Sequence, residues 1–239
     1  MRNLILAAGL ALAASGAWAQ DTVRLATEGA YPPYNFINDQ GELDGFEIEL
    51  GNALCEHAGL TCTWVQNDWD SIIPNLLAGN YDAIMAGMNI TDERDKVIDF
   101  TQNYTPPATS AYVGTSPDAD TMGTVAAQVS TIHSSYIADS GATLVEFPTA
   151  DEAVAAARNG EADVAFADYD YLTPIVAASG GELTFIGDPI PIGRGVGVGL
   201  RESDAELRGK LDDAIGAMKA DGSLNELITK WFPENPPTF

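Results

Sequence analysis

The stretch Tyr81-Asp82-Ala83-Ile84-Met85-Ala86-Gly87-Met88-Asn89-Ile90-Thr91-Asp92-Glu93-Arg94 joins an apolar run to a polar segment. The run from Ala83 to Met88 is typical of a buried strand. Asn89 and Thr91 can each cap a short helix that carries Arg94 in its first turn. An arginine there opposes the helix dipole, and a bound carboxylate would explain it, because helix N–H groups and a guanidinium both bind anions. An exposed Arg94 paired with a neighbouring aspartate is the alternative.

The first 19 residues have the pattern of a secretory signal peptide. A positive Met1-Arg2-Asn3 segment precedes an apolar segment, Leu4 to Ala14, that is short for a membrane span. Ala17-Trp18-Ala19 fits the small-residue cleavage pattern, so we expect the mature chain to begin at Gln20. Export, most simply to a periplasm, follows from this pattern, and no later stretch is apolar enough to span a membrane.

The mature chain is strongly acidic. Loss of Arg2 leaves 10 of the 11 lysines and arginines against 35 acidic residues, so the net charge changes from −24 to −25. This balance argues against nucleic-acid binding. It fits either attraction of cationic ligands or a solvated acidic surface.

Two cysteines, Cys55 and Cys62, are separated by six residues. In an oxidising compartment we expect them to form one disulfide. The two histidines are far apart and there is no second cysteine pair, so neither a metal site nor a cofactor is expected.

The first half of the chain alternates strands and helices. Asp44-Gly45-Phe46-Glu47 has the spacing of a capping box, with Asp44 as N-cap and Glu47 at N3, and Asp70 can cap a second helix. Strands are expected at residues 22–26, 62–65 and 83–88. The β-α-β-α-β order predicts a parallel sheet with crossover helices.

The second half repeats this arrangement, with a second capping box at Thr149-Ala150-Asp151-Glu152. Residues 79–87 can be aligned with residues 160–168, because each segment places a glycine and an aspartate before an apolar run. Gly87 and Asp168 then fall at the carboxyl ends of strands, where open α/β sheets bind ligands. Strands are expected at residues 124–127, 143–147 and 163–167.

Two segments can link the halves, residues 104–109 and 190–195. The second segment continues into glycines at alternate positions, which fit a crossing strand or hinge better than a nucleotide-binding loop. Helices are expected around residues 207–218 and 223–231, and we expect them to pack on the first lobe.

Four motifs together resemble the periplasmic solute-binding proteins of polar amino-acid ABC transporters, family 3. They are residues 26–36, residues 41–50, Tyr81 to Arg94, and residues 197–202. The resemblance is greatest to the cluster that binds lysine, arginine, ornithine, histidine and opines. It implies an α/β periplasmic binding protein type II fold, with two lobes, a two-strand hinge and a ligand cleft between the lobes. The expected lobes are residues 20–107 plus 196–239 and residues 108–195, with hinges near 105–111 and 190–196.

The same resemblance implies roles for individual residues. Arg94 would bind the ligand α-carboxylate, with the N–H groups of Asn89 and Thr131 as further donors. Asp168 would bind the α-ammonium, together with the backbone of residues 86–87. Tyr31 and Trp69 would surround the ligand side chain, and Glu28 would pair with its cationic end. The expected ligand-binding residues are Glu28, Tyr31, Trp69, Ala86, Gly87, Met88, Asn89, Arg94, Ser130, Thr131 and Asp168.

Some positions depart from the family pattern. Ala86 and Gly87 stand where many relatives carry hydroxyls, and Ile132 replaces a commonly polar residue. The added room leaves an opine as an alternative ligand. A dehydratase-like enzyme is a second alternative, since Ser130, His133 and Asp168 could form a triad. We interpret Ser130 instead as an anion donor and His133 as an ordinary helix residue.

The expected function is that of a monomeric periplasmic receptor. It would close on a basic amino acid by hinge motion and deliver it to a membrane permease, with no catalysis and no cofactor. A sensory module is a further alternative, which the absence of a membrane helix or kinase after the fold disfavours.

Overall fold

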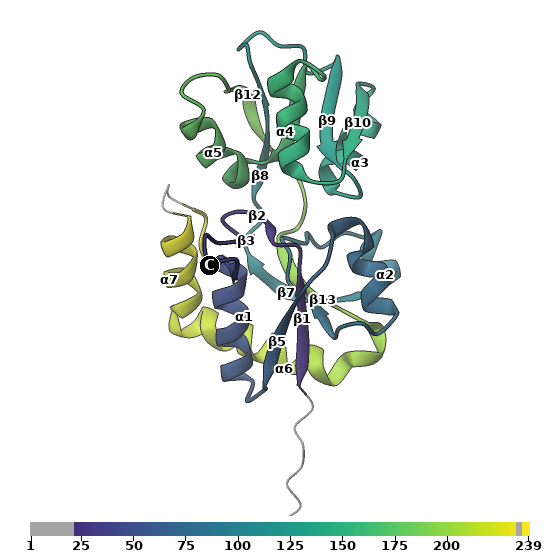
Figure 1. The fold of residues 1–239 in the computed structure, drawn as a ribbon. Coiled ribbons are helices and arrows are strands. Elements are labelled where there is room, and N and C mark those ends of the chain that lie inside the picture. Colours follow the sequence, from purple (N-terminus) through teal and green to yellow (C-terminus); the bar gives the residue numbers. More distant parts are fainter. Residues whose placement is uncertain (1–21, 233–235) are drawn as a thin grey trace, which may run out of the picture.

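The computed structural model describes residues 22–232 and 236–239. The expected signal peptide and its cleavage after Ala19 lie outside the described residues. Two five-stranded sheets, each with its own helices, lie one above the other (Figure 1). Within the described residues no helix combines the length and the apolar character needed to cross a membrane.

The first sheet has the strand order β5-β1-β6-β13-β7. Strands β1, β5 and β6 are parallel, as predicted, whereas β13 is antiparallel to both β6 and β7. The strands are β1 (Val23–Thr27), β5 (Cys62–Gln66), β6 (Ala83–Ile84), β7 (Asp99–Thr105) and β13 (Val196–Leu200).

The second sheet has the order β10-β9-β11-β8-β12. Strands β9, β10 and β11 are parallel, and β8 is antiparallel to β11 and β12. The chain enters this sheet between β7 and β8 and leaves it between β12 and β13 (Figure 1). The strands are β8 (Thr109–Gly114), β9 (Thr124–Gln128), β10 (Thr143–Phe147), β11 (Val164–Asp168) and β12 (Thr184–Pro191).

Helices cover both sheets. Helix α7 packs against α1 and α6, and α6 packs against β7, so the C-terminal helices lie on the first sheet (Figure 1). A small sheet of β2 (Ala30–Tyr31), β3 (Asn35–Ile37) and β4 (Leu43–Asp44) precedes α1. The helices are α1 (Phe46–His57), α2 (Ile72–Leu77), α3 (Ile132–Ser140), α4 (Ala150–Asn159), α5 (Tyr169–Ala178), α6 (Ala205–Asp221) and α7 (Ser223–Trp231), with 3-10 turns η1 (Trp69–Ser71), η2 (Arg94–Lys96) and η3 (Glu202–Asp204).

One predicted capping box forms and the other does not. At α4, the Glu152 N–H donates to Thr149 Oγ1 at 3.2 Å and the Thr149 N–H donates to Glu152 Oε2 at 3.1 Å. At α1 the N-cap is Gly45, not Asp44, with a φ of 125°. A Cβ at Gly45 would lie 2.5 Å from the Tyr34 carbonyl oxygen, so only glycine fits. Glu47 is fully buried and bonds elsewhere.

The other corrections concern the strand from residue 83 and the cap at residue 70. Strand β6 ends at Ile84, although the run stays largely buried to Met88. Gly87 has a φ of 63°, which turns the chain, and its N–H donates to Glu47 Oε1 at 2.7 Å instead of to a neighbouring strand. Asp70 lies inside η1 and makes no cap bond to α2.

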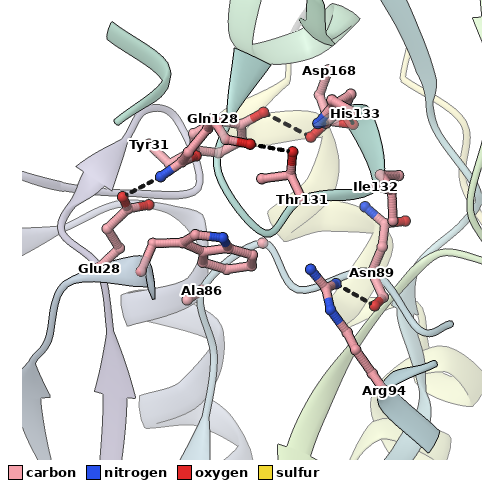
Figure 2. A pocket seen from close by; sticks show the side chains of 12 residues that line it. Glu28, Tyr31, Ala86, Asn89, Arg94, Gln128, Thr131, Ile132, His133 and Asp168 are labelled. Atoms are coloured by element: carbon pink, nitrogen blue, oxygen red, sulfur yellow. Dashed lines mark hydrogen bonds and ion pairs between the residues drawn. The ribbon is translucent and has the colours of Figure 1, made fainter. Parts of the chain in front are cut away.

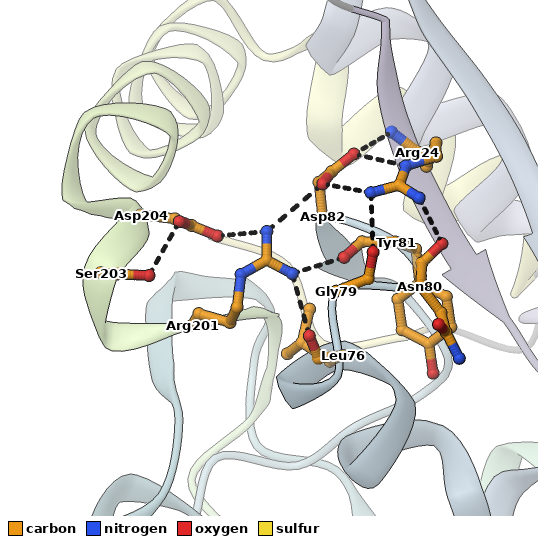
Figure 3. Close-up of polar contacts among 9 residues, drawn as sticks. All are labelled: Arg24, Leu76, Gly79, Asn80, Tyr81, Asp82, Arg201, Ser203 and Asp204. Atoms are coloured by element: carbon orange, nitrogen blue, oxygen red, sulfur yellow. Dashed lines mark hydrogen bonds and ion pairs between the residues drawn. The ribbon is translucent and has the colours of Figure 1, made fainter.

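A disulfide and several ion pairs stabilise the first lobe at positions away from the second lobe. Cys55 and Cys62 form the expected disulfide, which joins α1 to the start of β5. Asp82, just before β6, accepts from the guanidinium groups of Arg24 on β1 and Arg201 after β13 (Figure 3). Arg201 also pairs with Asp204 at 2.6 Å. These contacts fix the amino-terminal end of β6, while its carboxyl end faces the second lobe.

Candidate functional site

A pocket lies between the two sheets, at the carboxyl ends of several strands. Its walls come from both lobes: the segments after β1 and β6 and the turn η2 on one side, and the ends of β9 and β11 with the start of α3 on the other. The lining residues are Glu28, Tyr31, Trp69, Ala86, Gly87, Asn89, Arg94, Gln128, Thr131, Ile132, His133 and Asp168 (Figure 2). All expected ligand-binding residues except Met88 and Ser130 are in this set.

Met88 and Ser130 do not line the pocket, Met88 because it is buried beneath it and Ser130 because its side chain is exposed. Met88 is fully buried in an apolar cluster with Ile84 and Phe100. Ser130 has a φ of 59°, in the left-handed region, and its carbonyl accepts a 3.1 Å hydrogen bond from Arg94 Nη2. Ser130 therefore contacts the site through its backbone.

Arg94 points into the pocket from η2. Its Nη1 donates to the Asn89 carbonyl at 2.7 Å, and its guanidinium lies 5.3 Å from the centre of the Trp69 ring. Thr91 Oγ1 accepts from the Arg94 N–H at 3.2 Å, as expected for a capping residue. Burial lowers the Arg94 pKa to about 10, which still leaves it cationic at neutral pH.

The alternative in which Arg94 pairs with a nearby aspartate does not hold. Asp92 and Asp95 both pair with Arg194, whose Nη2 lies 3.2 Å from Asp92 Oδ1 and 2.6 Å from Asp95 Oδ2. The side-chain hydrogen bonds of Arg94 go to the backbone carbonyls of Asn89 and Ser130. Arg94 is therefore a half-buried cation with no carboxylate bonded to it in the described residues.

Asp168 ends β11 and is buried at the opposite wall. Its Oδ2 accepts a 2.7 Å hydrogen bond from the Tyr31 hydroxyl, and His133 Nε2 lies 3.4 Å from its Oδ1. Burial alone would raise the Asp168 pKa, but His133, Tyr31 and the charge of Arg94 together hold it below its usual value. The carboxylate is ionised at neutral pH.

Glu28 lies at a separate end of the pocket. Its Oε1 accepts a 2.6 Å hydrogen bond from Gln128 Nε2, which also donates to the Pro148 carbonyl at 3.1 Å. Burial raises the Glu28 pKa to about 7, and the bond from Gln128 only partly opposes this. A cation placed beside Glu28 would favour the ionised form. Figure 2 shows Glu28 and Gln128 apart from Arg94 and Asn89.

One of the two backbone donors expected for the ligand carboxylate, the Thr131 N–H, has another partner, and so does the N–H of Gly87. The Thr131 N–H donates to Ser134 Oγ at 3.3 Å, as part of the capping box that starts α3. The Gly87 N–H donates to Glu47 Oε1. Glu47 also accepts from Asn35 Nδ2 at 2.7 Å and from the Tyr104 hydroxyl, so it holds the turn at Gly87 in place.

Sequence reasoning missed three contributors to the site. Gln128 is the last residue of β9, and the strand-end rule that identified Asp168 could also have found it. Glu47 was assigned to a capping box. His133 was interpreted as an ordinary helix residue, yet its ring is buried, with Nε2 3.0 Å from Ser110 Oγ. His133 contacts Ser110 and not Ser130, so the imagined Ser130-His133-Asp168 triad is not assembled.

Residues 23–234 match the model of the bacterial extracellular solute-binding proteins, family 3. The chain belongs to this family. It is 34% identical to the L-arginine-binding protein of Pseudomonas aeruginosa, over 97% of each chain, and 32% identical to the histidine-binding periplasmic protein of Escherichia coli K12, again over 97% of each. The resemblance stated from the four motifs is therefore confirmed.

Solved structures of similar proteins confirm the type II fold. A periplasmic His/Glu/Gln/Arg/opine family-binding protein from Silicibacter pomeroyi in complex with lysine is 69% identical, with a TM-score of 0.90 over 91% of this chain and 100% of that chain. An ancestral arginine-binding protein bound to arginine is 28% identical, with a TM-score of 0.81 over 88% of this chain and 98% of that chain. These relatives are binding proteins for amino acids.

Proposed function

We propose that this chain is the periplasmic receptor of an amino-acid ABC importer and binds a basic L-amino acid, namely arginine, lysine, ornithine or histidine. The observation that carries the proposal is one pocket between the lobes that holds three separate ionisable groups. Arg94 and Asp168 suit the two charges of an amino-acid head group, and Glu28 suits a cationic side chain. Neutral or acidic amino acids would leave Glu28 without its partner.

The head group is assigned to Arg94 and Asp168. A guanidinium can bind a carboxylate through two parallel N–H bonds. Asp168 offers about four lone-pair sites, of which Tyr31 occupies one and His133 can occupy another, so acceptors remain for an ammonium. Because Asp168 is buried and Arg94 is half-buried, water and salt screen these interactions less than they would at the surface.

The side chain is assigned to the region of Glu28, Tyr31 and Trp69. The ring of Tyr31 is held by stacking on Tyr171, with centroids 4.2 Å apart and planes 3° from parallel. Such fixed rings suit the aliphatic stem of lysine or the planar guanidinium of arginine. The relatives named above include proteins whose names specify arginine or histidine, and one is in complex with lysine.

The mechanism is closure of two lobes, residues 20–107 plus 196–239 and residues 108–195, about hinges near 105–111 and 190–196. A ligand that contacts both lobes favours the closed arrangement by its differential affinity. The receptor would act as a monomer after signal-peptide cleavage following Ala19, and would pass its ligand to a membrane permease. The proposal includes neither catalysis nor a cofactor nor nucleic-acid binding.

The test is a thermal-shift panel on mature protein that has been unfolded, dialysed and refolded to remove carried-over ligand. A ligand at about 1,000 times its dissociation constant should add roughly 4 kcal/mol of stability. Arginine, lysine, ornithine or histidine should raise the melting temperature, whereas glutamate, glutamine and leucine should not. Stabilisation by an acidic or apolar amino acid would refute the assignment of Glu28. An opine as the best ligand would support the alternative that Ala86 and Gly87 leave room for.

A further inference from the structure

The buried imidazole of His133 has no role in the proposed function. His133 lies in the first turn of α3 and is only 5% exposed. Its Nε2 lies 3.0 Å from Ser110 Oγ and 3.4 Å from Asp168 Oδ1, and Figure 2 shows the ring beside that carboxylate. The ring also packs edge-on against Phe166, with centroids 5.5 Å apart and planes at 80°. Packing thus fixes a ring nitrogen next to Asp168.

Hydrogen-bond chemistry decides which ring nitrogen carries the proton. A neutral imidazole has one donor nitrogen and one acceptor nitrogen. Without its proton, Nε2 would turn a lone pair toward the ionised Asp168. With its proton, Nε2 donates toward the oxygens of Ser110 and Asp168. The surroundings therefore select the tautomer of His133 that is protonated at Nε2.

We propose that His133 is a positioning residue that holds the Asp168 carboxylate for the ligand ammonium, an inference that rests on the proposed function. Tyr31 binds Oδ2 from the first lobe and His133 faces Oδ1 from the second. The two contacts restrain rotation of the carboxylate about its Cβ–Cγ bond. Orientation of a binding group in advance lowers the entropic cost of binding.

The charge of His133 should then control affinity. A proton added at Nδ1 makes the ring cationic, so that imidazolium and ligand ammonium compete for Asp168. Strand β9 brings no titratable group to the ring, and α4 approaches it with Ala150, Ala153 and Val154. The titratable and charged groups of the surrounding elements are Asp168 on β11, Arg94 on η2, Tyr31 on β2, Glu28 after β1, Tyr112 on β8, Tyr136 and Asp139 on α3, the exposed Glu146 on β10, and the exposed Asp151, Glu152 and Arg158 on α4.

Two substitutions separate positioning from packing. His133→Gln keeps a neutral N–H donor of similar reach, whereas His133→Phe keeps a ring and removes the donor. At about pH 8 we expect His133→Phe to weaken lysine binding about 10- to 100-fold, because a buried carboxylate loses a donor, and His133→Gln to weaken it much less. His57 at the exposed end of α1 provides the matched control, since His57→Gln should leave the affinity unchanged.

The dependence of lysine affinity on pH provides a second readout, because a residue that only packs in the core would not change it. Glu28 titrates near pH 7, so the comparison is made in a Glu28→Gln background. In that background, lysine affinity should fall as the pH is lowered from about 8, because a cationic ring would compete with the ligand ammonium for Asp168. The fall should disappear when His133→Gln is added.

The deciding experiment is NMR of histidine-labelled His57→Gln protein, in which His133 supplies the single imidazole signal because the chain has two histidines. Without lysine at about pH 8, we expect the tautomer protonated at Nε2. The tautomer protonated at Nδ1 would overturn the inference. Equal affinity for lysine and an unchanged pH profile in both His133 variants would also overturn it. If His133→Phe fails to fold, the tautomer observed by NMR is the deciding result. Wild-type protein is titrated with lysine in parallel, and failure of that titration would instead overturn the proposed function.

Discussion

The Tyr31 hydroxyl donates a 2.7 Å hydrogen bond to Asp168 Oδ2, across 137 residues of sequence. Tyr31 lies in β2 beside the first sheet, and Asp168 ends β11 of the second. Two further hydrogen bonds join the lobes, one from Gln128 to Glu28 and one from Arg94 to the Ser130 carbonyl. The groups assigned to ligand binding are therefore also the groups that join the lobes, which connects recognition to closure.

Replacement of Arg94 should remove most of the affinity for any amino acid. Arg94→Ala should cost roughly 2–5 kcal/mol of binding free energy, because a buried carboxylate would lose its cation. Arg94→Lys should recover little, since an ammonium lacks the planar two-donor geometry. Calorimetric titration with lysine measures both. Arg158→Ala, at an exposed surface pair with Glu182, is the control and should change the dissociation constant less than about twofold. Equal losses at both arginines would contradict the assignment.

Glu28 should make the ligand-free protein less stable as the pH rises from about 4.5 to about 7. Burial raises its pKa from 4.5 to about 7, so the folded chain holds a proton that the unfolded chain has released in this window. The protonated form contributes its full stabilisation below about pH 4.5. This contribution is lost as the pH rises through 7, and the largest possible loss is about 3 kcal/mol. Urea unfolding of wild type and Glu28→Gln should show a flatter profile for the variant. Parallel profiles would mean that Glu28 is not buried as described.

Glu47 should be important for stability and for the shape of the pocket. Its buried carboxylate accepts from Asn35 Nδ2, the Gly87 N–H and the Tyr104 hydroxyl. Glu47→Leu should lower the free energy of unfolding by about 3 kcal/mol or more, because three buried donors lose their acceptor. Tyr104→Phe should cost about 1–3 kcal/mol.

Denaturant titration measures these losses, with Glu49→Gln on the same helix as control. Glu49 forms a surface pair with Lys230, so its replacement should cost about 1 kcal/mol or less. If Glu47→Leu were as mild as Glu49→Gln, the buried cluster would not have the importance assigned to it.

The disulfide should contribute modestly to stability and not to binding. Cys55 and Cys62 are seven positions apart, so their bond closes a short loop and should stabilise the fold by about 2 kcal/mol. A Cys55→Ala/Cys62→Ala variant should melt earlier and, while folded, bind lysine as tightly as wild type. A changed affinity in the folded variant would show that α1 and β5 influence the pocket, contrary to this account.

Periodicity and capping patterns predicted much of the fold because they depend on local chemistry. The strand at residues 143–147, the capping box at Thr149 and the final helix from Ser223 to Trp231 all match the structure. The capping box at Asp44 failed for a non-local reason. Gly45 is required by the approach of the Tyr34 carbonyl, and Glu47 is drawn inward by partners as distant as Gly87 and Tyr104.

The site residues also divide into those that local sequence patterns predict and those that depend on distant contacts. Arg94 and Asp168 stand out because a charge next to an apolar run or at a strand end is conspicuous in sequence. Gln128 and His133 do not, since their importance depends on Glu28 and Asp168 in other parts of the chain. The spacing of residues along one strand or helix cannot show which side chains will meet across two lobes.

The central claim is that a cationic side chain is recognised by Glu28. The most direct test compares lysine with norleucine, which keeps the four-carbon stem and lacks the ε-ammonium, by calorimetric titration of wild type and Glu28→Gln at about pH 8. We predict that wild type binds lysine at least about 100-fold more tightly than norleucine, and that Glu28→Gln largely removes this difference, since a buried charge pair is worth several kcal/mol. Equal affinities for the two ligands in wild type, or an undiminished preference for lysine in Glu28→Gln, would contradict the account.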